Sequence, residues 1–214
     1  WGFKAPVLIA NLDRIFNLFP NCKMIHIVRD GRDVCLSYQA IHNNQKIEEK
    51  FGPKGVVANA LYWIDGLRRI ERISSFEIYE FRYEDLIIRP KKELTQLCEF
   101  LEVDYSPEMH QSYQQSRDKN NLLSNNLSST IHTKLSQGLD SNNMKKYTRL
   151  MSKSAQFRFE LLTAPYLKKY GYELTFPWLN NHFFTPFRAA VYFVAQKLND
   201  FRYSRRDRKV CLPD

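Results

Sequence analysis

Residues 19–38 read FPNCKMIHIVRDGRDVCLSY, and this stretch decides the fold. Residues 23–28 (KMIHIV) are rich in β-branched and apolar side chains on both alternations, which predicts a strand buried on both faces of a parallel sheet. The polar turn RDGRD follows at residues 29–33, and residues 34–41 then continue as a helix with carboxylates near its start. This order of strand, turn and helix is typical of a βα unit.

The same alternation continues along the chain. Residues 76–81 (FEIYEF) predict a second strand, and Pro90 begins a helix after it. Strands that alternate with helices predict an α/β protein with a doubly wound, mostly parallel sheet. Further helices are expected at residues 12–19, 57–74, 154–170 and 185–201, with Gly171 ending the third of them.

Length and composition predict one globular domain with an appendage. The chain has 214 residues, of which 43% are hydrophobic, and this is enough to form one sizeable core. We expect the domain to cover residues 1–178 and to include a flexible loop at 116–143, a candidate lid rich in Ser, Asn and Lys. Residues 179–214 are expected to form a C-terminal helix and a basic tail.

The net charge of +9 favours a polyanionic partner, which could be a nucleotide, a nucleic acid or an acidic lipid surface. An aromatic helix followed by basic residues suits peripheral contact with a membrane surface better than nucleic acid. The alternative is a helix packed on the domain with a solvated basic end. The four cysteines lack CxxC spacing, which indicates a reducing compartment such as the cytoplasm. The Golgi lumen is the alternative if an anchor precedes residue 1.

Arg29 is the first candidate for ligand binding, because it follows the predicted strand at the edge where open α/β sheets bind ligands. Ser37 lies eight residues on, about two helical turns away and on roughly the same face. A guanidinium and a hydroxyl can together hold a phosphate. The alternative is a structural turn in which the Arg and Asp side chains of RDGRD pair with each other.

Three segments, in order, resemble sulfotransferases that use 3′-phosphoadenosine 5′-phosphosulfate (PAPS). Residues 20–37 resemble the 3′-phosphate-binding motif of that family. Residues 82–86 (RYEDL) resemble its YEDL segment, and residues 164–172 (APYLKKYGY) resemble its closing helix with the GY ending. The resemblance implies a three-layer, P-loop-like fold with a central, mostly parallel sheet.

The resemblance also implies roles for single residues. Arg29 and Ser37 would hold the 3′-phosphate of the donor, and Tyr83 would lie beside the adenine or bound the nucleotide pocket. Tyr83 could equally be a core aromatic residue at a strand end. Lys134 would contact a phosphate from the loop, although the tryptophan that usually follows this loop in the family is absent here.

Near the start, WGFKAP at residues 1–6 resembles a Lys-x-Pro segment of protein-tyrosine and bacterial sulfotransferases. Lys4 is therefore the expected catalytic residue, because a positioned ammonium can stabilise charge that develops during sulfuryl transfer. The alternative is a solvated lysine at a frayed end. The resemblance implies no metal.

One part of the family pattern has no counterpart in this sequence: the Gly-containing loop that wraps the 5′-phosphosulfate at a helix N-terminus. We therefore expect an N-terminally truncated sulfotransferase, with the first strand and this loop missing and with no turnover by the piece itself. The whole enzyme would transfer sulfuryl from PAPS to a hydroxyl of a carbohydrate, lipid, peptide or small molecule. The alternative is a nucleotide-binding relative without chemistry, and no nucleic acid partner is expected.

Overall fold

The computed structural model describes residues 2–4, 6–44, 52–73, 76–109, 143–194 and 197. Residues 185–194 form a helix that follows the last labelled element. The labelled helices and strands are η1 (Pro6–Ala10), α1 (Leu12–Leu18), β1 (Met24–Val28), α2 (Gly31–Asn43), α3 (Val56–Arg72), β2 (Ile78–Arg82), α4 (Tyr83–Ile88), α5 (Pro90–Leu101), α8 (Tyr147–Leu150), α9 (Lys153–Lys169), η3 (Pro177–Asn180) and η4 (His182–Phe184).

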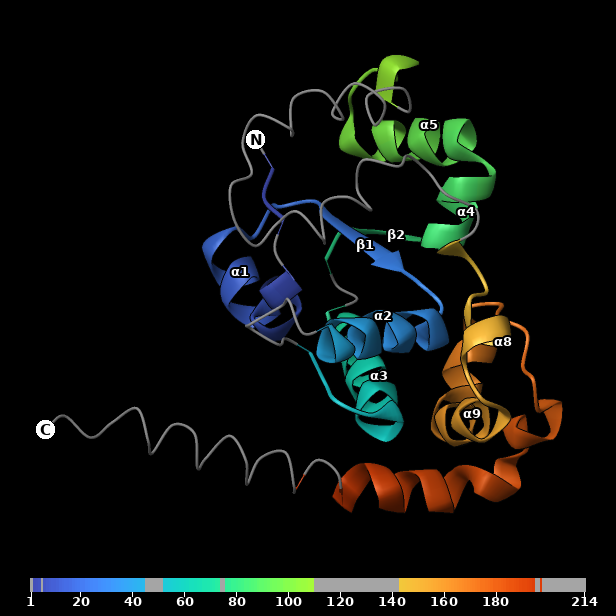
Figure 1. The fold of residues 1–214 in the computed structure, drawn as a ribbon. Coiled ribbons are helices and arrows are strands. Elements are labelled where there is room, and N and C mark those ends of the chain that lie inside the picture. Colours follow the sequence, from blue (N-terminus) through green and yellow to red (C-terminus); the bar gives the residue numbers. More distant parts are fainter. Residues whose placement is uncertain are drawn as a thin grey trace, which may run out of the picture.

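The two strands of the described residues, β1 and β2, pair in parallel, with a register that runs from Met24↔Ile78 to Val28↔Arg82. Helices α2, α3 and α9 lie on one side of this sheet and α5 lies on the other (Figure 1). The α/β class and the parallel sheet are thus confirmed. Because both strands run the same way, the segments that follow them meet at one edge.

The main core lies among α2, α3, α8 and α9. Phe159 and Leu167 of α9 are fully buried, and the Phe159 ring lies 6.2 Å from that of Trp63 in α3. The first residue of α2, Gly31, fits between these two rings only because it has no side chain. A Cβ atom there would lie 2.6 Å from Trp63 Cδ2 and 2.8 Å from Phe159 Cζ.

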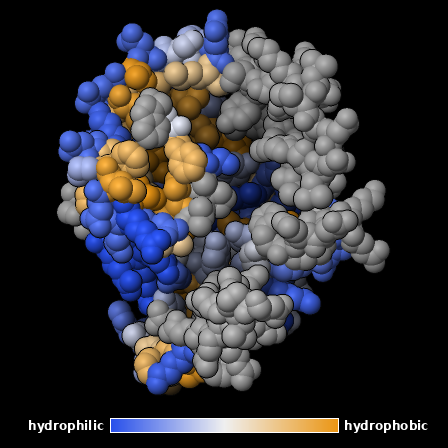
Figure 2. All heavy atoms as spheres, turned by 90° about the vertical axis from the view of Figure 1, so that its left-hand side faces the viewer, coloured by the Kyte–Doolittle hydropathy of each residue, from blue (hydrophilic) through white to orange (hydrophobic). Residues whose placement is uncertain are grey.

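The prediction that β1 is buried on both faces was wrong. Ile25 and Ile27 are 40% and 51% exposed, because α5 packs on the neighbouring strand, where the Tyr79 ring lies 5.4 Å from that of Phe100. Met24, on the other face of β1, packs against the cluster that α1 and α3 form. Apolar residues gather at the surface on the side of the molecule that carries α1 (Figure 2).

Several predicted boundaries shift for local reasons. Helix α2 begins at Gly31, because Asp30 caps it through a hydrogen bond from Arg32 N to Asp30 Oδ1 (2.9 Å). Helix α4, formed by residues that follow β2 directly, was not expected. Gly171 follows α9 with φ +73°, as predicted for a glycine after a helix end.

The helix at residues 185–194 packs on the same core. Arg188 Nε donates a hydrogen bond to Leu161 O of α9 (2.9 Å), and the Arg68 guanidinium of α3 lies 3.9 Å from the centre of the Tyr192 ring. Nearly all of the predicted loop and the whole basic tail at 202–209 lie outside the described residues. Within the described part, no helix is long and apolar enough to cross a membrane.

Candidate functional site

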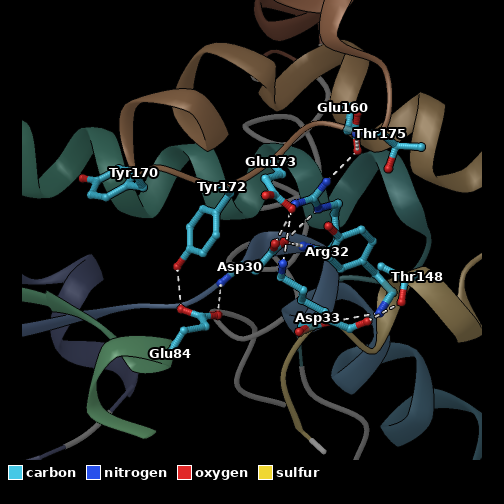
Figure 3. A network of polar contacts seen from close by, with 12 residues as sticks. Asp30, Arg32, Asp33, Glu84, Thr148, Glu160, Tyr170, Tyr172, Glu173 and Thr175 are labelled. Atoms are coloured by element: carbon cyan, nitrogen blue, oxygen red, sulfur yellow. Dashed lines mark hydrogen bonds and ion pairs between the residues drawn. The ribbon is translucent and has the colours of Figure 1, made fainter. Parts of the chain in front are cut away.

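Glu84 joins the three segments that were singled out in the sequence, at the carboxyl end of β1. Its Oε1 accepts a hydrogen bond from Asp30 N (3.1 Å), just after β1. Its Oε2 accepts one from the Tyr172 hydroxyl (2.9 Å), just after α9. Figure 3 shows Glu84 between these two partners. A single carboxylate of α4 therefore holds the turn after β1 and the segment after Gly171 in place.

Arg32 lies fully buried beside this point and is completely paired. Its Nε and Nη2 donate to the two carboxylate oxygens of Asp30 (3.0 and 2.7 Å), and its Nη1 donates to Glu160 Oε1 (2.6 Å) (Figure 3). Burial by itself would lower the pKa of Arg32, but the hydrogen bond and charge of Asp30 raise it above its ordinary value. Arg32 is therefore a permanent buried cation with a structural role.

The same cluster fixes the chain on either side of α9. Glu160 also accepts hydrogen bonds from the backbone N–H groups of Thr175 and Phe176 (3.0 Å each). Asp33 Oδ1 accepts one from Tyr147 N (2.9 Å), and the Arg32 guanidinium lies 3.7 Å from the centre of the Tyr147 ring. Burial raises the pKa of Asp33 above its ordinary value.

Arg29 differs from Arg32 in that its hydrogen-bonding capacity is incompletely used. Its guanidinium lies 4.6 Å from the centre of the Tyr83 ring, and its Nη2 donates to Asn143 O (2.7 Å). The Arg29 backbone carbonyl accepts a hydrogen bond from Trp63 Nε1 (3.0 Å). The Nε atom of Arg29 is buried and has no hydrogen-bond partner among the described residues. A half-buried guanidinium with an unmatched donor could bind an anion.

Among the predicted site residues that the structure describes, Arg29 and Tyr83 are in contact. Ser37 is an exposed residue farther along α2, where its hydroxyl donates a partly buried hydrogen bond to Asp33 O of its own helix (3.1 Å). Lys4 is exposed. Lys134 lies outside the described residues. The roles of all these residues therefore stay predictions.

His26, a residue of β1, is a paired residue of the sheet. Its Nδ1 lies 2.8 Å from Glu80 Oε2 on β2, and this hydrogen bond lowers the pKa of Glu80. The described residues contain no group of three or more His, Cys, Asp or Glu side chains that could hold a metal ion.

Sequence reasoning missed Glu84, Glu160 and Asn143. For Glu160 a signal existed: the residue lies on the same helix face as Thr163 and Leu167, which are both buried. A carboxylate on an apolar face requires a cationic partner. For Asn143 no signal was available, because it contributes a backbone carbonyl.

The fold and the arginine at the strand end fit the open α/β proteins, which bind ligands outside the carboxyl ends of their strands. Comparison with known proteins identifies the family. The sequence model of the sulfotransferase family matches residues 1–107, which are half of the 214-residue chain. The chain belongs to the sulfotransferase family.

Two curated relatives are similar over part of their length. Sulfotransferase 1B1 of Canis lupus familiaris is 27% identical over 133 residues, which cover 54% of this chain and 45% of the relative. Sulfotransferase 1 family member D1 of Rattus norvegicus is 30% identical over 98 residues, which cover 42% of this chain and 33% of the relative. The chain thus spans less than half the length of either relative.

Among solved structures, the sulfotransferase domain from the curacin biosynthetic pathway is similar in fold. The TM-score is 0.50 at 22% identity, and the match covers 80% of this chain and 62% of that domain. At this identity the likeness concerns the fold alone.

Proposed function

We propose that this protein is a sulfotransferase that moves a sulfuryl group from PAPS to an acceptor hydroxyl, and that Arg29 holds the 3′-phosphate of the donor. The observation that carries the proposal is the unmatched, buried Nε of Arg29 at the carboxyl end of β1. The family to which the chain belongs supports the reaction. The acceptor is a carbohydrate, lipid, peptide or small alcohol, and the proposed compartment is the cytoplasm.

The contacts of Arg29 suit the recognition of a phosphate. The Tyr83 ring and Asn143 O hold the guanidinium from two sides, so little side-chain freedom remains to be lost on binding. A guanidinium presents its N–H donors as a fork that matches two phosphate oxygens. Ser37 can join only if its hydroxyl turns away from Asp33 O. Lys4 remains the proposed source of charge stabilisation during transfer.

The proposal is tested by comparing two nucleotides, 3′-phosphoadenosine 5′-phosphate and AMP, in isothermal titration calorimetry. The wild-type protein should prefer the first, because only that nucleotide carries a 3′-phosphate. Arg29→Ala should weaken its binding by about 10- to 100-fold, the equivalent of a hydrogen bond to a charged group. Arg69→Ala, which removes an exposed pair with Asp65, is the matched control and should bind as the wild type does.

Equal affinity of the wild type for both nucleotides would contradict the donor site. A second assay distinguishes a sulfotransferase from a nucleotide-binding relative that does not catalyse transfer. It measures sulfuryl transfer from PAPS to a panel of sugar, phenol and alcohol acceptors by the full-length protein. Selective nucleotide binding without any transfer would favour that alternative.

We also propose peripheral contact with an anionic membrane, because one specific surface favours it. Arg188 and Tyr192 attach one face of the helix at residues 185–194 to the core. The side chains of Phe183, Phe187 and Val194 are exposed, by 80%, 49% and 56%. Residues 202–209 (RYSRRDRK) follow with five basic side chains and one acidic one. Exposed aromatic surface beside basic charge is typical of interfacial helices.

Cosedimentation with vesicles tests the membrane contact. The protein should bind phosphatidylserine-containing vesicles and not pure phosphatidylcholine, and the double change Phe183→Ser with Phe187→Ser should weaken binding. Leu150→Ser removes a different apolar side chain, 68% exposed, and serves as control. Equal binding by both variants and the wild type would exclude this surface.

A further inference from the structure

Strand β2 has one free edge among the described residues. Its other edge is bonded to β1, where Met24 N donates to Glu77 O (3.0 Å) and Met24 stands opposite Ile78. Because the backbone groups of successive residues in a parallel ladder point to opposite edges, those of Ile78 and Glu80 face away from β1. None of the described residues pairs with these N–H and C=O groups. An edge of this kind can accept a further strand.

An open cavity of about 370 Å³ lies along this edge. Four consecutive residues of β2, 79–82, line it. Since successive side chains of a strand point to opposite faces, a cavity that touches all four lies at the edge of the sheet. Glu93 and Gln96 of α5 line one side and Tyr170, after α9, lines the other, in keeping with the places of α5 and α9 on opposite sides of the sheet (Figure 1). The edge is therefore a groove with two walls.

The wall that α5 forms carries a carboxylate whose bonding is incomplete. Glu93 is 8% exposed. It accepts no side-chain hydrogen bond among the described residues, and its ion pair with Arg89 is long, at 3.8 Å. Arg89 and Arg82 both bind Asp85 more closely, at 2.8 and 2.6 Å. Burial of a carboxylate without a close cation is costly. A Lys or Arg side chain that enters the groove would supply that cation.

Further carboxylates make the groove acidic. The Tyr170 hydroxyl donates to Glu80 Oε2 (3.2 Å), whereas Glu80 Oε1 has no partner among the residues described. Burial, and then the charges of Glu93 and Glu99, raise the pKa of Tyr79, so both of these carboxylates lie near the edge. In a chain of net charge +9, an acidic groove is a local exception. Its charge is complementary to a basic occupant.

We propose that the free edge of β2 binds an extended, basic segment of a partner protein, which joins the sheet as a further strand. Backbone hydrogen bonds to Ile78 and Glu80 hold the segment, and its alternate side chains reach the two walls of the groove. A second copy of this chain fits poorly, because two paired β2 edges would bring like charges together. The groove is separate from the Arg29 site, so its test does not depend on the proposed function.

The probe is a short capped peptide that alternates Lys and Val, titrated into the full-length protein by isothermal titration calorimetry. The wild type should bind it and should not bind the peptide in which Glu replaces Lys. Glu93→Gln should weaken binding by about tenfold, as expected for the loss of a hydrogen bond to a charged group. Glu108→Gln removes an exposed carboxylate that does not line the groove and should bind as the wild type does. A peptide N-methylated along its backbone keeps its charges and should not bind.

Amide hydrogen exchange gives a second readout that needs no substitution, and it decides the question if Glu93→Gln is unstable. The peptide should slow exchange at Ile78 and Glu80 and leave Tyr79 and Phe81, which face β1, nearly unchanged. Three results would overturn the proposal. The first is protection of Ile78 and Glu80 before peptide is added, because the chain itself would then fill the edge. The second is equal binding of the N-methylated peptide, and the third is equal binding by both glutamine variants.

Discussion

Arg29 and Arg32 lie at the two ends of one short turn after β1, yet their surroundings are opposite. Arg32 is fully buried, and two carboxylates, those of Asp30 and Glu160, pair with it. Arg29 has an aromatic ring and a carbonyl oxygen as neighbours, and its Nε is unmatched among the described residues. The hydrogen-bond partners of a cation therefore distinguish a structural residue from a candidate ligand-binding residue better than its place in a motif does.

The largest expected effect is on stability and concerns Arg32. Arg32→Met should lower the free energy of unfolding by about 3–5 kcal/mol, because Asp30 and Glu160 would remain buried without their cation. Arg29→Met should change it less, by about 1 kcal/mol, because Asp33 loses the nearby charge of Arg29 but keeps its hydrogen bond from Tyr147 N. Urea unfolding of both variants measures the difference. If Arg29→Met were the more destabilising change, the two roles would be reversed.

Gly31, which lies between the two arginines in the sequence, should give the next largest effect. Gly31→Ala places a methyl group against the Trp63 and Phe159 rings, and overpacking of this kind costs about 1–3 kcal/mol. The expected result is a lower urea midpoint for unfolding with an unchanged dependence on urea. Gly2→Ala is the control, because nothing lies within 4 Å of a Cβ atom there. An unchanged midpoint for Gly31→Ala would show that the turn moves without cost.

Much of this geometry could be expected from local sequence patterns. The strand at Met24–Val28, the helices that begin at Pro90 and Lys153, and the role of Gly171 all follow from periodicity and turn chemistry. The position of Arg29 at the sheet edge follows from the βα order. These features depend on residues that are close together in the chain.

What could not be predicted depends on partners far apart in the sequence. Glu160 is separated from Arg32 by 128 residues, and no local pattern indicates which carboxylate meets a buried arginine. The exposure of Ile25 and Ile27 depends on where α5 packs, and apolar content alone predicted burial on both faces. Helix α4 was also not predicted. Its first turn is stabilised by the ion pair between Arg82 and Asp85 (2.6 Å), and the sequence RYEDL was interpreted only as the segment after a strand.

The smallest expected effect is a pH dependence at Asp33, which lies next to both arginine environments. Its raised pKa means that the folded protein binds this proton more tightly than the unfolded chain. Stability should therefore fall as the pH rises from the ordinary value of 3.8 through the higher folded pKa, and stay constant above it. Asp33→Asn keeps an oxygen for Tyr147 N and should be more stable than the wild type at neutral pH, with the difference vanishing in acid.

Asp85 supplies the control of opposite sign for this titration. The hydrogen bond from Arg82, followed by that from Arg89, lowers the pKa of Asp85. Its contribution to stability is therefore present above the ordinary value of 3.8 and is lost as the pH falls through the lower folded pKa. Asp85→Asn should be less stable than the wild type at neutral pH, and this difference should also shrink in acid. Urea unfolding across the pH range measures both, and a loss of stability in Asp33→Asn at neutral pH would mean that Arg29 already satisfies the charge of Asp33.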